Sequence, residues 1–188
     1  MSMTGTIQVL NRMVEDRIVQ RYAIGGAVAA LNYVEPRFTS DLDIFITFDN
    51  PSPSGLVTLG PIPGYLAKLG YTEWKDEGLL IEGWPVQFLP ASDRLDSEAL
   101  EKAVEIEDDF GSGEKVRTRV FSAEHVVAIA VRTGRPKDFL RVDDFIGQAA
   151  VNLRELRDVL ERHDLLDKWA VFCRKTGRSD PLALIDKL

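Results

Sequence analysis

One stretch of the chain, residues 22–48, reads YAIGGAVAALNYVEPRFTSDLDIFITF. A short apolar run ends at the pair Gly25-Gly26, and the Ala-rich segment that follows has the composition of a buried helix, which Pro36 ends. Residues 41–48 then alternate as a strand does, with two aspartates at its start. The stretch therefore predicts strand, glycine turn, helix and strand, and the short connection makes the two strands neighbours in one sheet.

The glycine pair predicts a place where an anion can approach the backbone. Gly25 and Gly26 carry no Cβ atom, and the start of a helix offers unpaired N–H groups to a phosphate. A tight strand-to-helix turn without a ligand explains the same two residues. Taken alone, the pair favours that simpler explanation.

Asp41 and Asp43 predict a cation site. They lie two residues apart on a strand, so both carboxylates leave the same face, about 6.5–7 Å apart along the chain. Like charges this close repel each other unless a cation lies between them, and Mg²⁺ prefers carboxylate and phosphate oxygens. Solvated aspartates at a strand end are the alternative, and they are commoner for an isolated Asp-x-Asp. A phosphate turn beside a carboxylate pair on the next strand favours a Mg-nucleotide site.

The remaining pattern predicts an α/β core over residues 1–121 and a helical region over residues 122–188 that packs on it. In the first part we expect helices at residues 6–17, 62–69 and 97–107, a loop at 49–55, and strands within 71–74, 79–91 and 115–121, with a turn near Gly83. In the second part we expect helices at residues 123–132, from Pro136 onward, and within 151–175.

Composition narrows the class of protein. The chain has 188 residues, 45% of them hydrophobic and 28% charged, and no apolar run approaches the roughly 18–20 residues that a membrane helix needs. The first residues lack the pattern of a secretory signal, and a single cysteine, Cys173, excludes an internal disulfide. We therefore expect a soluble cytoplasmic protein without membrane partners. Residues 1–110 carry 18 acidic and 8 basic side chains, whereas residues 111–188 carry 12 and 15.

Two segments together resemble a known group of proteins. GGAVAAL followed by TSDLDIFI is similar to the signature of the nucleotidyltransferase superfamily, and SAEHVVAIAVRTGRPKDFLRVDDFI, residues 122–146, resembles the R-x-K-D segment of AbiEii/AbiGii-toxin-like nucleotidyltransferases. The resemblance covers roughly residues 20–146. It implies an α+β nucleotidyltransferase fold, with a mixed sheet flanked by helices and additional C-terminal helices. It also implies transfer of a nucleotidyl group from an NTP with Mg²⁺ or Mn²⁺.

The resemblance assigns roles to particular residues. Asp41 and Asp43 would bind the metal, and the triphosphate would lie on Gly25, Gly26 and Ala27. The expected contacts to nucleotide or acceptor in the later segment are Arg132, Arg135, Lys137 and Asp138. An RNA, a protein or a small hydroxylated molecule would be the acceptor, and a partner protein from a toxin–antitoxin-like pair is a further expectation.

Two positions depart from the family pattern. Ala27 stands where active members usually have Ser or Gly, which removes one hydroxyl donor. Gln87 stands where a third carboxylate is expected, and an amide oxygen can ligate a metal but is a poor general base. Glu82 would substitute if the hairpin brought it near. The alternative hypothesis is a protein of the same fold that has lost catalysis and serves as a binding or regulatory module.

Overall fold

The computed structural model describes residues 1–35, 39–48 and 59–183; Pro36 and the loop expected at 49–55 lie outside these ranges. The chain divides into two compact units, one of residues 1–28 and 38–121 and the other of residues 29–37 and 122–188. One boundary falls within the short helix α2 (Gly26–Ala30), and another follows Phe121. Among the described residues, no helix is both long and apolar enough to cross a lipid bilayer.

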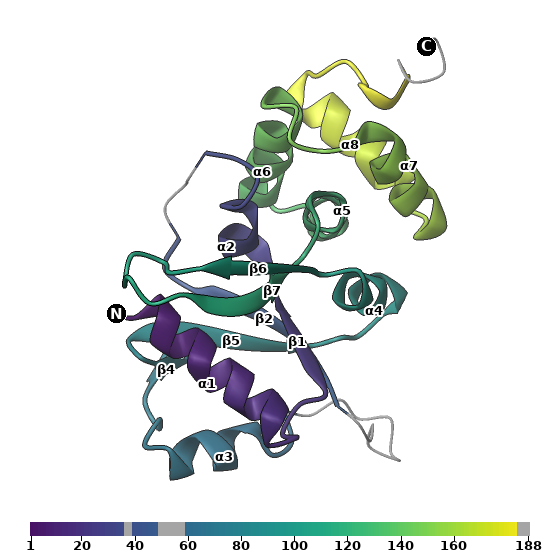
Figure 1. Ribbon diagram of the computed structural model, residues 1–188. Helices are drawn as coiled ribbons and strands as arrows, with labels where there is room; N and C mark the ends of the chain where they lie inside the picture. Colours follow the sequence, from purple (N-terminus) through teal and green to yellow (C-terminus); the bar gives the residue numbers. More distant parts are fainter. Residues whose placement is uncertain (36–38, 49–58, 184–188) are drawn as a thin grey trace. The chain divides into compact units, whose positions relative to one another are not determined.

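The first unit is built on a mixed sheet, whose seven described strands follow the order β3-β4-β5-β2-β1-β7-β6 (Figure 1). The strands are β1 (Arg21–Ile24), β2 (Leu42–Thr47), β3 (Trp74–Lys75), β4 (Gly78–Ile81), β5 (Trp84–Pro90), β6 (Val104–Asp108) and β7 (Val116–Val120). Strand β1 is antiparallel to β2 and parallel to β7, and β2 is parallel to β5. The predicted α+β class with a mixed sheet is confirmed, as are the adjacent strands on either side of the glycine turn.

Helix α1 (Met3–Glu15) covers one face of this sheet and contacts β1 and β7. Its buried apolar residues Ile7, Leu10 and Met13 recur at helical spacing, and Ser2 caps its first turn by accepting a hydrogen bond from the Gly5 N–H. The helix begins three residues earlier than predicted. Two further helices complete the unit, α3 (Ile62–Lys68), as predicted, and α4 (Arg94–Glu101).

The predicted helix over residues 97–107 is wrong in its second half. Helix α4 starts at Arg94, after the Asp93 carboxylate accepts the Asp96 N–H, and it ends at Glu101. Residues 104–108 form β6 instead, antiparallel to β7. Their sequence, VEIED, alternates with period two, and the ladder to β7 satisfies their backbone groups. The Arg117 Nε also donates to the Glu107 carboxylate at 3.2 Å across the pair.

The second unit is helical beyond Ser122, as predicted. Its helices are α5 (Ala123–Thr133), α6 (Pro136–Gly147), α7 (Leu153–Arg162) and α8 (Leu166–Thr176). Ser122 caps the start of α5, and Gly134 ends it with a left-handed φ of 69° that glycine adopts without strain. The fully buried Trp169 and Phe172 pack against each other in its core, with ring centroids 5.2 Å apart.

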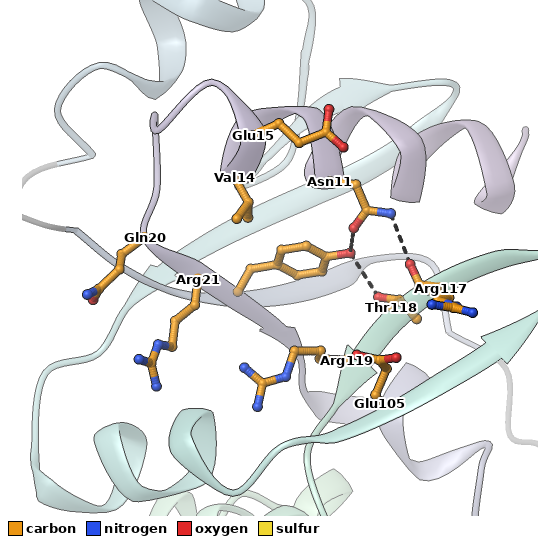
Figure 2. Close-up of a pocket in the computed structure, with 10 residues that line it drawn as sticks. Asn11, Val14, Glu15, Gln20, Arg21, Glu105, Arg117, Thr118 and Arg119 are labelled. Atoms are coloured by element: carbon orange, nitrogen blue, oxygen red, sulfur yellow. Dashed lines mark hydrogen bonds between the residues drawn. The ribbon is translucent and has the colours of Figure 1, made fainter.

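Tyr22 bridges a gap between β1 and β7. These strands pair at Ile24 and Val120 and are not paired further toward Arg21 and Arg117. The buried Tyr22 hydroxyl donates to Asn11 Oδ1 at 2.7 Å and lies 3.0 Å from Thr118 Oγ1 (Figure 2). Burial raises the pKa of Tyr22 to about 12, and the hydrogen bond with Thr118 opposes part of that rise. The neutral phenol therefore joins helix α1 to the sheet.

We expect alkaline pH to remove this contribution. A phenol whose folded pKa is about 12, against 10 when unfolded, stabilises the fold fully below pH 10 and progressively less as pH rises toward 12. Tyr22→Phe should lower the unfolding free energy at pH 7 by about 1 kcal/mol. The gap between variant and wild type should close and then reverse as pH rises from 10 to 12, because a rise in pKa from 10 to about 12 outweighs about 1 kcal/mol. The phenolate absorbance of the wild type minus that of the variant isolates the Tyr22 signal. This difference should titrate with a midpoint near pH 12, and a midpoint near pH 10 would contradict the burial of the hydroxyl.

Candidate functional site

A row of three residues crosses the sheet on the face opposite α1. The Gly25 N–H donates to the Asp43 carbonyl oxygen at 2.9 Å, and Asp43 is aligned with Gln87 in the parallel pairing of β2 with β5. The Tyr22 side chain points toward α1, and Tyr22 pairs with Ile46 of β2. Because side chains alternate along a strand, Ala23 in β1, Gly25 just after it and Asp43 in β2 are turned to the other face. The structure thus brings three of the predicted site residues side by side.

Gly26 touches the carboxylate of Asp43. A Cβ atom added to Gly26 would lie 1.9 Å from Asp43 Oδ2, well inside any allowed contact. Gly26 also has a φ of 58°, a left-handed conformation that costs other residues about 1–3 kcal/mol. Only glycine allows this turn and leaves the half-buried Asp43 carboxylate in place.

Gly25 is required for a different reason. A Cβ atom there would lie 2.7 Å from the ring of Phe45 and 3.2 Å from that of Phe121. These two rings pack with their centroids 4.7 Å apart, and both side chains are buried. The Gly25 N–H is already used in the contact with β2, so it is not available to a phosphate. Gly25 therefore leaves room for the Phe45 and Phe121 rings, whereas Gly26 leaves room for the Asp43 carboxylate.

Asp41 lies exposed just before β2, and Asp43 lies half-buried within the strand. The Thr39 hydroxyl donates to Asp41 Oδ1 at 3.0 Å and holds that carboxylate. Within the described residues, no group of three or more His, Cys, Asp and Glu side chains is arranged to hold a metal ion. Two carboxylates and one amide suit a cation such as Mg²⁺, which binds one or two carboxylates and takes further oxygens from substrate phosphates and water.

Gln87 is held by an acid that the sequence analysis missed. Its Nε2 donates to Glu77 Oε2 at 2.9 Å. In the hairpin of β4 and β5, Leu79 pairs with Val86, which places residues 77 and 78 beside Gln87. This register follows from a turn at Gly83, and it could have been derived from the sequence.

Glu82 does not take the place of the third carboxylate. It lies in the turn at the opposite end of the same hairpin, where it accepts a hydrogen bond from the Tyr71 hydroxyl. Its side chain also lies against Gly5, in the first turn of α1. The condition for Glu82 to substitute is therefore not met, because the acid that the hairpin brings to Gln87 is Glu77.

Ala27 belongs to α2, and the remaining predicted residues belong to the second unit. Helix α2 has five residues, so its dipole adds less to an anion site than the sequence analysis assumed. Lys137 is exposed in the first turn of α6, and Arg132 lies in the last turn of α5. Asp138 is buried, its carboxylate accepts from the Arg135 Nε at 2.7 Å and from the Arg135 N–H, and Arg141 lies on its other oxygen. These contacts make Asp138 a capping residue of α6.

Two hollows in the described part of the first unit lie away from the row. One, of about 580 Å³, is lined by residues of α1, β1, β6 and β7, among them Arg21, Arg119 and Glu105 (Figure 2). The other, of about 520 Å³, lies beside the start of α1 and includes Tyr71 and Glu82. Neither hollow is lined by Asp41, Asp43 or Gln87.

No protein-family model matches the sequence, and no curated protein matches it either. Among solved structures, the chain is similar to the solution structure of the antibiotic-resistance factor ANT(2'')-Ia, at 17% sequence identity and a TM-score of 0.48, over 93% of this chain and 96% of that chain. It is also similar to the crystal structure of an antigenic nucleotidyltransferase-like protein from Paracoccidioides brasiliensis, at 18% identity and a TM-score of 0.48, over 89% and 93% of the two chains.

Gly26→Ala tests whether the glycine holds Asp43 in place. The added methyl group forces the Asp43 carboxylate to turn away, and the left-handed backbone adds strain, so the unfolding free energy should fall by about 1–3 kcal/mol. Gly64→Ala is the matched control, because Gly64 lies within helix α3 with no atom near its added Cβ. The control should be neutral or stabilising in a urea titration. Equal stability of the two variants would contradict the close contact.

Asp138→Asn should destabilise the helical unit, because a buried carboxylate that accepts from two arginines would lose its charge. We expect the unfolding free energy to fall by about 1–3 kcal/mol. Lys137→Gln, at the neighbouring exposed position, should change it by less than about 0.5 kcal/mol. Thermal unfolding followed by circular dichroism makes the comparison, and an unchanged Asp138→Asn variant would rule out the capping role.

Proposed function

We propose that the protein is a nucleotidyltransferase that transfers an NMP group from an NTP to a hydroxyl acceptor, with Mg²⁺ or Mn²⁺. The observation that carries the proposal is the contact of Gly26 with the Asp43 carboxylate. The contact brings the glycine turn directly beside one carboxylate of the adjacent strand, that of Asp43, two residues after Asp41. Such a turn lets phosphate oxygens approach the backbone where the same cation can bind them.

Four residues in or beside the row have separate tasks in this proposal. Asp41 and Asp43 would hold the cation, and Gln87 would add a neutral oxygen ligand from β5. The bound cation would neutralise the triphosphate and the charge that develops during transfer. Gly26 would keep the Asp43 carboxylate beside the turn. Positioning and charge neutralisation account for most of the rate in phosphoryl-type transfers, and this chain offers both.

In the proposed reaction, the acceptor oxygen forms a bond to the α-phosphorus while the bond from that phosphorus to the bridging oxygen breaks, and pyrophosphate leaves. The acceptor hydroxyl loses its proton to water or to an aspartate. Gln87 cannot take this proton, because an amide is not a base at neutral pH. An RNA end, a protein side chain and a small hydroxylated molecule are the acceptor classes to be screened, and a toxin–antitoxin-like partner is one source of a protein acceptor.

Gln87 also favours a second function of another kind. A chain of this fold whose third carboxylate is an amide, held by Glu77, can bind a nucleotide without turning it over. The protein would then act as a binding or regulatory module. The two functions predict the same nucleotide site and differ in chemistry.

Calorimetric titration with each of the four NTPs, in Mg²⁺ and in EDTA, tests the site common to both functions. We expect metal-dependent binding of at least one NTP, and we expect Asp41→Asn/Asp43→Asn to abolish it, because the variant lacks both carboxylates of the cation site. Glu15→Gln/Glu105→Gln removes two negative charges from the same unit, beside the hollow of Figure 2, and should bind normally. Binding that ignores EDTA, or survives in the Asp variant, would refute the proposed site.

Turnover distinguishes the enzyme from the binding module. Gln87→Asp puts a carboxylate in the row, so it should increase pyrophosphate release in the presence of Mg·NTP and an acceptor extract. Full general-base catalysis is worth on the order of 10²–10⁴ in rate, and we expect an increase of about tenfold or more. Wild-type release that is already high and does not change in Gln87→Asp would show that the third carboxylate is unnecessary.

A further inference from the structure

The hydrogen bond between Gln87 and Glu77 fixes which end of the Gln87 amide faces the row. A carboxylate ion accepts hydrogen bonds and donates none, so only the NH₂ end of the amide can face Glu77. The separation of Gln87 Nε2 from Glu77 Oε2 is 2.9 Å, an ordinary charge-assisted contact. The carbonyl end, Oε1, must therefore point away from Glu77.

The strand order decides what Oε1 points toward. Strand β5 lies between β4 and β2, so Glu77, which immediately precedes β4, and Asp43, in β2, lie on opposite sides of Gln87. With the NH₂ group turned toward the β4 side, the carbonyl oxygen is turned toward the β2 side and Asp43. Among the described residues, no donor is recorded for Gln87 Oε1. The oxygen is thus available to a cation held by Asp43.

A tight hairpin delivers Glu77 to this position. Lys75 pairs with Gly78, which leaves Asp76 and Glu77 as the two residues of the turn, and Asp76 adopts a left-handed φ of 53°. Gly78 lies so close to β5 that an added Cβ would be 2.8 Å from the Pro85 carbonyl carbon. The backbone on both sides of Glu77 is therefore constrained, although its side chain is exposed.

We propose that Glu77 is a positioning residue that turns the carbonyl oxygen of Gln87 toward Asp43, as a neutral third oxygen ligand for the nucleotide-bound cation. The proposal rests on the proposed nucleotide site and adds to it a residue that does not touch the cation. Without Glu77, the Gln87 amide is free to present its NH₂ group, and its partial positive charge repels a cation. A carboxylate at position 87 would need no such orientation, because both of its oxygens are acceptors.

Glu77→Gln is the variant that tests this orientation at constant size. Its amide can accept or donate, so the Gln87 side chain is no longer held in one orientation, and we expect Mg·ATP to bind roughly tenfold more weakly, in the range found when a partner of a metal ligand is removed. Asp76→Asn removes the same charge from the same turn and suits its left-handed backbone. The control should bind within about twofold of wild type. If both variants weakened Mg·ATP binding equally, the loss of one negative charge would explain the effect, and the proposal would be overturned.

The weakening caused by Glu77→Gln should disappear or reverse when position 87 is itself a carboxylate. In the Gln87→Glu background, Glu77 repels its neighbour and has no amide to orient, so Glu77→Gln should leave Mg·ATP binding equal or tighter. A residue that only supports the hairpin would weaken binding in both backgrounds. Weakening of similar size in both would therefore overturn the positioning role.

A spectroscopic measurement keeps this test separate from the nucleotide site. The side-chain NH₂ signals of Gln87, assigned by their loss in Gln87→Glu, should move in the Glu77→Gln spectrum without nucleotide and stay in place in the Asp76→Asn spectrum. Signals unmoved in Glu77→Gln would overturn the contact itself. If instead the signals move but wild-type protein binds no Mg·ATP in calorimetry, the proposed function fails, and with it the cation-directed role of Glu77, while the contact stands.

Discussion

The candidate site depends on the approach of a backbone to a carboxylate. Gly26 lies so close to Asp43 that a single methyl group would overlap Oδ2, and its left-handed turn lets the chain leave β1 without covering the carboxylate. The adjacent Gly25 is needed for the packing of Phe45 and Phe121 beneath the turn. Two neighbouring glycines thus meet two separate steric demands, and together they keep the half-buried Asp43 carboxylate in place at the middle of the sheet.

Much of this arrangement could be predicted from local sequence. An apolar run, a glycine pair and an alternating strand define β1, the turn and β2, and a short connection makes the strands adjacent. The two roles of the glycines could not be predicted, because they depend on which atoms lie across the turn. The helix predicted over residues 97–107 follows from the helical spacing of Leu100 and Val104, whereas Val104 and Ile106 alternate as in a strand, and the ladder to β7 decides between the two. In the second unit, Asp138 is expected from the resemblance to contact the nucleotide or acceptor, and the structure shows it buried and paired with Arg135 and Arg141 as a capping residue of α6.

At Gln87, the expectation from the family resemblance and the structure differ. The resemblance treats Gln87 as a lost carboxylate, with Glu82 as a replacement only if the hairpin brings it near. The hairpin register places Glu77, and not Glu82, beside Gln87. Glu77 accepts a hydrogen bond from the Gln87 amide and does not replace Gln87 in the row. A neutral oxygen fixed in orientation suits the binding of a cation and its nucleotide, and it leaves proton removal to other groups. The distinction between an enzyme and a binding module therefore depends on chemistry at position 87, whereas the proposed cation site depends on Asp41 and Asp43.

The most direct test of the account is the place where a paramagnetic cation binds. Mn²⁺ added with ATP broadens the amide signals of nearby residues, and substoichiometric amounts suffice. We expect broadening to be centred on Gly25, Gly26, Asp43 and Gln87 and to disappear when EDTA is added. Broadening centred on another part of the first unit, such as the hollow lined by Arg21, Glu105 and Arg119, would contradict it.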